Sequence, residues 1–151
     1  MRNLSEQHGT RDIQIAGLSI WIHQRQFPES EEFWDANWLD ITAGCEASGA
    51  QVETSGSILH LTELDKLLRE CRQMHASLSG KASFVCMERE LDLKLEMQTG
   101  GRLTMEVKIT PNHLEQKHWF QFEIDQSYLP ELIRDCQQIL EKFPLKYESR
   151  I

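Results

Sequence analysis

The nearest thing to a metal-ligand spacing in this sequence is Cys71 and His75, four residues apart in a segment of helical periodicity. Side chains at this spacing share one face of a helix, and thiolate sulfur and imidazole nitrogen both bind zinc. That face is also the apolar stripe predicted to face the core, and no second pair completes a tetrahedral site. We therefore favour a buried histidine hydrogen-bonded to the backbone. His113 and His118, five residues apart around a loop, give a weaker signal, and we expect no metal.

The motifs of common catalytic and cofactor sites are absent. The sequence has no phosphate-binding loop, no dinucleotide-binding glycine motif, no HExxH zinc motif and no GxSxG nucleophile motif. Each cysteine falls on an apolar face, so in a reducing compartment we expect small buried hydrophobic side chains, with disulfides as the alternative. The cysteines are Cys45, Cys71, Cys86 and Cys136. We expect neither a cofactor nor catalysis.

Carboxylates are numerous, and several fall on the polar side of predicted strands. Four of them are Asp92, Glu96, Glu106 and Glu123. If these strands are neighbours, the carboxylates form an acidic sheet face that Lys94 and Lys108 relieve. An acid–base pair needs one carboxyl group in an apolar pocket, and the sequence shows no such setting. A solvated sheet face is the expected structure.

Two tryptophans, Trp38 and Trp119, also fall on the polar side of their strands, Trp38 beside Asp40. A tryptophan among outward carboxylates resembles an interface anchor, because tryptophan is enriched at binding hot spots. The alternative, which we weigh more heavily, is that a helix or loop covers that side and the tryptophans pack beneath it. Trp21 shares this ambiguity, and Trp34 is expected to plug the edge of the core from a loop. The candidate partner-binding residues are Trp38, Asp40, Asp92, Glu96, Glu106, Trp119 and Glu123.

Alternating apolar and polar residues predict the strands that must position these side chains. The predicted strands cover residues 13–22, 37–45, 50–59, 82–87, 91–97, 103–109 and 119–124. The clearest feature is a hairpin of 91–97 and 103–109, with a turn at Gly100–Gly101, where glycine readily adopts positive φ. Residues 82–87 are apolar on both faces, which predicts a central, buried strand.

Helical periodicity predicts two amphipathic helices. The first begins after Thr62 as N-cap and ends near Gly80; the second is capped by Ser127, has Pro130 in its first turns and ends before Pro144. Because strands and crossover helices do not alternate, we predict an α+β fold: a mainly antiparallel β-sheet of about six to seven strands with two amphipathic helices packed on it. Residues 1–151 form a single domain, with 1–11 and 146–151 as loose termini.

The formal net charge is −8, from 24 acidic and 16 basic residues. This charge argues against non-specific binding of nucleic acid and permits steered association with a basic partner; the simpler interpretation is that it keeps the domain soluble. The N-terminus has no apolar run and no stretch is long enough to cross a bilayer, so we expect a cytoplasmic protein.

The order of several segments is similar to a known family. These segments are residues 33–39, 61–64, 80–82, 101–103, 120–129 and 143–144. Together they resemble the WapI-like immunity proteins of bacterial polymorphic toxin systems, and related small bacterial domains, over residues 13–144. The resemblance implies a cytosolic, non-catalytic protein that binds the C-terminal domain of a toxin and blocks it. Many such toxins have basic clefts, which an acidic inhibitor would suit. The resemblance transfers no contact residues.

Two other functions stay open. A ligand-binding module or enzyme would use a pocket between sheet and helices, with Cys71, His75, Glu63 or Glu123 as the residues to suspect. A structural subunit would bury the sheet face in a homodimer, with Trp38 and Trp119 as symmetric contacts. We rank the toxin-binding protein first, as a monomer or homodimer.

Overall fold

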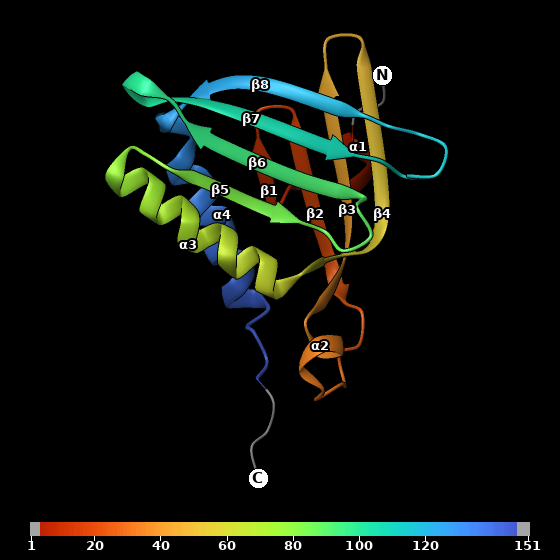
Figure 1. Cartoon of the computed structure of the whole chain (residues 1–151). Coiled ribbons are helices and arrows are strands. Elements are labelled where there is room, and N and C mark those ends of the chain that lie inside the picture. The colour runs from red at the N-terminus through yellow and green to blue at the C-terminus, as the bar shows by residue number, and fades with distance from the viewer. Residues whose placement is uncertain (1–3, 148–151) are drawn as a thin grey trace.

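The computed structural model describes residues 4–147 of the chain, which form two four-stranded antiparallel sheets and associated helices (Figure 1). The first sheet contains, in spatial order, β1 (Ile13–Ile15), β2 (Leu18–Arg25), β3 (Trp38–Ala47) and β4 (Ala50–His60). The second contains β5 (Lys81–Val85), β6 (Leu91–Met97), β7 (Arg102–Ile109) and β8 (Trp119–Asp125). The helices are α1 (Leu4–His8), α2 (Phe33–Ala36), α3 (Leu61–Ser77) and α4 (Leu129–Lys142), with 3₁₀ turns η1 (Thr99–Gly101) and η2 (Gln126–Tyr128).

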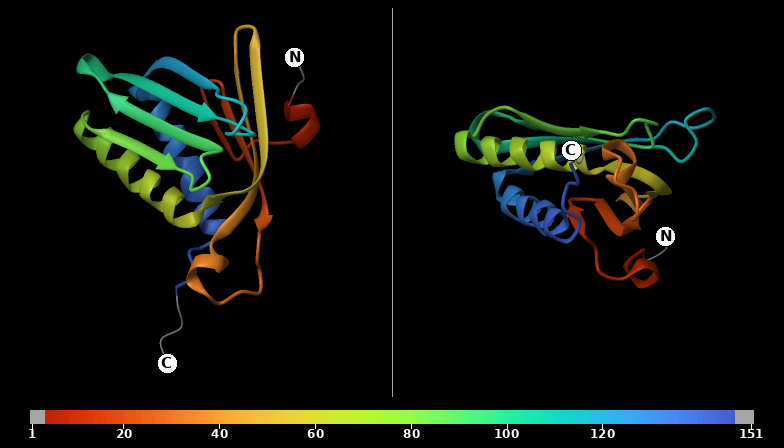
Figure 2. Two further views of the ribbon diagram at one scale, coloured as in Figure 1. Left: turned by 45° about the vertical axis from the view of Figure 1, so that its right-hand side comes forward. Right: turned by 90° about the horizontal axis from the view of Figure 1, so that it is seen from below.

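The predicted α+β class with antiparallel strands is confirmed, but the described strands number eight and divide into two sheets. Buried side chains of both sheets and of α3 and α4 form one hydrophobic cluster. Figure 2 shows α3 beneath the second sheet, with α4 between α3 and the first sheet. Alternation assigns each residue to a face but carries no information on which strands share a sheet, so the division was not predictable from it.

Helix α1, which lies in the stretch expected to be loose, packs on the outer side of the first sheet around Trp21 and Gly44. Leu4 is buried there, and Gly44 makes room for it, because a Cβ at Gly44 would lie 2.3 Å from Leu4 Cδ1. Trp21 is only 2% exposed and donates a hydrogen bond from Nε1 to the carbonyl oxygen of Gly9 at 3.0 Å. For Trp21, the interpretation that a covering segment buries the tryptophan is therefore correct.

The predicted hairpin of the second sheet is present, with the predicted side chains on its inner face. Leu93 pairs with Val107 and Leu95 with Met105, and all four side chains are buried. The turn between the strands contains η1, and Gly100 has a φ of 80°, a conformation that favours glycine. Alternation therefore located both the strands and their inner face.

Strand β5 is an edge strand, and the prediction of a central, buried strand at 82–87 was wrong. Its side chains alternate between buried and accessible, and Val85 is exposed. Helix α3 runs along the outer edge of β5 and bonds to its backbone: Glu70 Oε1 accepts from the N–H of Ser83 at 3.1 Å, and Lys66 Nζ donates to the carbonyl oxygen of Ser83 at 2.8 Å. Glu63 Oε2 accepts from the N–H of Val85 at 3.3 Å. The run is apolar on its second face because of Val85 and Met87, which are exposed, so it does not indicate a central position.

Both long helices begin one to two residues away from the predicted caps. Helix α3 follows β4 without a loop, and its N-cap is His60, not Thr62; the His60 side chain accepts from the N–H of Thr62. Ser127 lies inside η2, whose cap is Asp125, and α4 starts at Leu129. In α4, Asp135 Oδ2 accepts from the N–H of Gln14 at 3.4 Å, which ties the last helix to β1.

Candidate functional site

Five of the seven candidate residues lie on one surface, the face of the second sheet that points away from the helices. This open face consists of three rows across the four strands, and no helix lies in front of it in Figure 1. The first row is Val85, Asp92, Lys108 and Trp119; the second is Ser83, Lys94, Glu106 and Gln121; the third is Lys81, Glu96, Thr104 and Glu123. The predicted neighbourhood of Asp92, Glu96, Glu106, Trp119 and Glu123 therefore exists.

The open face is not strongly acidic, because lysines alternate with its carboxylates. Lys94 is the cross-strand partner of Glu106, and Asp92 is the partner of Lys108. A third lysine, Lys81, lies 4.0 Å from Glu96 Oε1. Opposite charges at cross-strand positions offset each other, so the face offers mixed charge to a partner.

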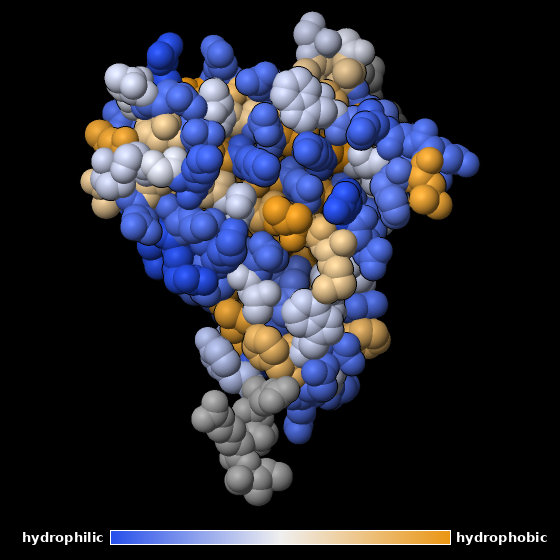
Figure 3. Space-filling view, in the orientation of Figure 1, coloured by the Kyte–Doolittle hydropathy of each residue, from blue (hydrophilic) through white to orange (hydrophobic). Residues whose placement is uncertain are grey.

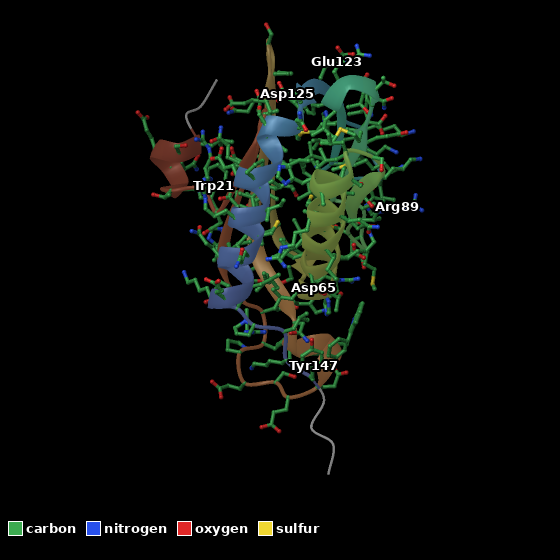
Figure 4. The ribbon with its side chains drawn as sticks, turned by 90° about the vertical axis from the view of Figure 1, so that its left-hand side faces the viewer. Trp21, Asp65, Arg89, Glu123, Asp125 and Tyr147 are labelled. Carbon is green, nitrogen blue, oxygen red and sulfur yellow. The ribbon has the colours of Figure 1, made fainter. Side chains whose placement is uncertain are left out.

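A groove of about 840 Å³ lies at one end of the open face, between the loop after β5, the loop that joins β7 to β8, and the first row. Four cations (Arg89, Lys94, Lys108 and Lys117) and two carboxylates (Asp92 and Glu106) line it, with His113 and His118. In an acidic protein this groove therefore has an excess of cationic side chains. Figure 4 shows Arg89 and Glu123 on the side of the molecule opposite Trp21.

Asp92 forms part of the floor of this groove and is held by the turn beside it. Its Oδ1 accepts a hydrogen bond from the N–H of Cys86 at 3.1 Å. Partial burial raises the pKa of Asp92, whereas the Cys86 hydrogen bond and the positive charges of Lys108, Arg89 and Lys94 act in the opposite direction. The carboxylate thus helps to position the loop while three cations surround it.

Exposed apolar side chains gather at the same end of the open face. Val85 and Trp119 end the first row, Trp119 being 52% exposed, and Met87 and Leu114 are exposed in the adjoining loops. Figure 3, which views this face, shows hydrophobic side chains surrounded by hydrophilic ones. Apolar anchors within a polar rim are the usual composition of a protein–protein interface.

The other two candidates, Trp38 and Asp40, lie on the first sheet and are not part of the open face. Trp38 is half-buried in an aromatic cluster with Trp34 and His60: the Trp34 and His60 rings stack at 4.4 Å, and Trp38 packs edge-on to His60 at 4.9 Å. Trp34 is 42% exposed, so it covers His60 rather than plugging the core. Asp40 accepts a hydrogen bond from the Ser57 hydroxyl.

Asn37 organises this aromatic end and was not identified from the sequence. It is fully buried, and its Nδ2 donates to the carbonyl oxygens of Phe33 (2.8 Å) and Lys146 (2.9 Å), while its Oδ1 accepts from the N–H of Lys146 at 2.9 Å. The chain is thereby fixed through Lys146 and Tyr147, within the predicted loose terminus; residues 148–151 of that terminus lie outside the described residues. The role of Asn37 could have been predicted only if its burial were known, and the sequence around Asn37 carries no periodic pattern from which burial can be inferred.

His60 is buried with both ring nitrogens hydrogen-bonded. Its Nε2 lies 2.9 Å from the carbonyl oxygen of Trp34, and its Nδ1 lies 2.6 Å from Thr62 Oγ1 and accepts from the Thr62 N–H. These contacts fit a neutral ring with its proton on Nε2. Burial lowers the pKa of His60, although the Trp34 carbonyl and Glu63 act against the shift.

The residues suspected of ligand chemistry do not form a site. Cys71 is buried in the core whereas His75, one turn further along α3, is exposed, so the prediction of a buried histidine was wrong. Glu63 is bonded to β5 and Glu123 lies on the open face. Among residues 4–147, no group of three or more His, Cys, Asp or Glu side chains could hold a metal ion.

Within residues 4–147, no helix combines the length and apolar character needed to cross a membrane.

Comparisons with known proteins identify one family. The model of the immunity protein WapI-like family matches residues 10–144. No curated protein matches the sequence. A solved structure, described as the crystal structure of WHY3 from Arabidopsis thaliana, is similar to 87% of this chain over 85% of its own, with 13% identity and a TM-score of 0.47. These values are too low to bear on the fold or the function of this chain.

Proposed function

The chain belongs to the WapI-like immunity protein family, and from this premise we propose that it binds one toxin domain in the cytoplasm and blocks it without catalysing a reaction. The observation that carries the choice of surface is the groove end of the open face. Exposed Trp119 and Val85 lie there beside mixed charges, and none of the helices within residues 4–147 covers them. A rigid sheet that presents a tryptophan supplies a preorganised anchor, which reduces the entropy cost of binding.

Charge supports a basic partner at long range. Between Arg25 and Lys66 the chain has nine carboxylates and no lysine or arginine, which accounts for the acidic balance. A net charge of −8 accelerates encounter with a basic domain, in a manner that salt screens. At short range, the cations of the groove favour an acidic side chain of the toxin. The positive charge of the groove, which is opposite in sign to the net charge of the protein, therefore fixes the docked orientation.

The proposal is tested by mixing the purified protein with the toxin domain encoded beside it, at low and at moderate salt. We expect a one-to-one complex, inhibition of the toxin, and an association rate that falls as salt increases. Replacing Trp119 with alanine is expected to weaken binding by roughly 30-fold or more, the effect of removing a hot-spot residue.

Trp34→Ala is the matched control, because Trp34 is also a half-exposed tryptophan but lies in the aromatic end. It is expected to change affinity by less than about twofold. The reverse ranking of the two variants would move the binding surface to the aromatic end. Failure to form any complex, with both proteins folded, would refute the proposed function.

A further inference from the structure

Strand β8 has a free backbone edge. The N–H of Ile109 donates to the carbonyl oxygen of His118 at 3.3 Å, so by antiparallel alternation Phe120, Phe122 and Ile124 exchange hydrogen bonds with β7. The backbone groups of Trp119, Gln121 and Glu123 then point away from the sheet. Within the described residues, β8 pairs with β7 alone, and no hydrogen bond to these outward N–H groups is present.

The opposite edge of the same sheet is closed. There, the outward backbone groups of Ser83 and Val85 bond to Glu63, Lys66 and Glu70 of α3. In the first sheet, the outward N–H of Gln14 in β1 bonds to Asp135 of α4. Side chains of α3 and α4 thus bond to the outward backbone groups of β5 and β1. Within the described residues, no helix side chain bonds to the outward backbone groups of β8. In Figure 1, β8 forms the upper border of the front sheet.

The side chains of β8 would oppose pairing with an acidic strand but not with a basic one. Strand β8 has no lysine, proline or bulge in its regular register with β7, and its charged side chains are the carboxylates of Glu123 and Asp125. On its inner side, Phe120 and Phe122 are only half-buried, with their rings nearly parallel at 6.5 Å. On the open face, Glu123 lies opposite Thr104 and so has no cationic partner on β7, whereas Asp125 lies opposite Arg102. An added strand would bury the two rings and meet the carboxylates.

We propose, on the basis of the toxin-binding function proposed above, that an extended segment of the toxin pairs with β8 as a fifth strand of this sheet. Main-chain hydrogen bonds to Trp119, Gln121 and Glu123 provide affinity, and alternate side chains provide specificity. The segment has apolar residues toward Phe120 and Phe122 and lysine or arginine toward Glu123, since opposite charges at cross-strand positions are favourable. Because Trp119 also ends the first row, the added strand adjoins the groove.

Amide hydrogen exchange resolved by residue tests the proposal on the wild-type protein, free and in complex. In the free protein, the amides of Phe120, Phe122 and Ile124 should exchange slowly and those of Trp119, Gln121 and Glu123 quickly. In the complex, the three outward amides should slow by about tenfold or more. If the complex forms but these amides stay unprotected, the strand pairing is refuted and the proposed function stands. If no complex forms, the proposed function itself is refuted.

A pair of variants isolates the backbone contribution. Gln121→Pro removes one outward N–H without breaking a β7 bond, a position where an edge strand tolerates proline; Gln121→Ala keeps that N–H and removes only the side chain. We expect Gln121→Pro to weaken the complex at least about tenfold more than Gln121→Ala, with both variants retaining the circular dichroism spectrum of the wild type. Equal affinities overturn the proposal. Protection of the outward amides in the free protein at high concentration, with a dimer by light scattering, also overturns it, because a second copy is then the occupant.

Discussion

Replacing Asn37 with alanine measures how much the hydrogen bonds of the aromatic end (Trp34, Trp38 and His60 with Asn37) contribute to the stability of the fold. Asn37 is fully buried and makes three side-chain hydrogen bonds of 2.8–2.9 Å, two of which tie Lys146 to the loop that contains α2. Alanine removes all three and leaves the Phe33 carbonyl without this partner. Each bond contributes about 1 kcal/mol net to stability. Since water can reach the half-buried Lys146 backbone, we expect a total loss of about 2 kcal/mol in the free energy of unfolding.

Urea denaturation followed by circular dichroism measures this difference, and thermal unfolding should show a midpoint lower by about 4–8 °C. Asn112→Ala is the matched control: Asn112 is exposed, and its Oδ1 accepts from the N–H of Leu114 at 3.1 Å. It should change stability by less than about 0.5 kcal/mol. An Asn37→Ala protein as stable as this control would show that the buried network is dispensable and would refute the reasoning.

Three further predictions follow from burial. Phe84→Ala should cost about 3–5 kcal/mol of unfolding free energy because it leaves a cavity in the core, whereas Val85→Ala, next to it but exposed, should cost little; similar urea midpoints for the two would contradict the packing. His60 has a lowered pKa, so the stability that its neutral ring supports is present above pH 6.5 and is lost as the pH falls through the folded-state value. The difference in unfolding free energy between about pH 7.5 and about pH 5 should therefore shrink in His60→Asn, and an unchanged difference would assign it to other groups. The four cysteines should react with a thiol reagent only after denaturation, because burial raises every thiol pKa, to about 12 for Cys45 and Cys71; rapid labelling of the native protein would show local opening.

Periodicity predicted the part of the fold in which local pattern and tertiary position agree. In the 91–97 and 103–109 hairpin, each strand has one face on the core and one in water, so alternation gave the faces and the glycine turn gave the pairing. It failed for β5, since an exposed valine on the open face gives the same apolar run as a central strand would. The helix caps shifted because β4 leads directly into α3, which gives His60 the position that composition assigns to Thr62.

The candidate site was predicted in part for the same reason. The alternation of residues along each strand placed Asp92, Glu106 and Glu123 on one face of the sheet. Alternation cannot show that lysines pair with these carboxylates or that two loops form a groove at one end of the face. Parity also grouped Trp38 with Trp119, which lie on different sheets. The free edge of β8 had no signal in the sequence, because backbone pairing depends on which elements lie beside a strand and not on the side chains of the strand itself.

The consecutive order of strands in each sheet determines how the chain can fold. Every strand pairs only with its neighbours in sequence, so each sheet assembles through local connections, of which residues 26–37 between β2 and β3 are the longest. Closing connections of this length costs little entropy and proceeds quickly. The exception is α4, which packs on β1 and bonds to Gln14 across 121 residues of chain. During synthesis, the first sheet can form while the second is still being made, but the shared core closes only when α4 leaves the ribosome. The chain therefore completes its shared core only with its last helix.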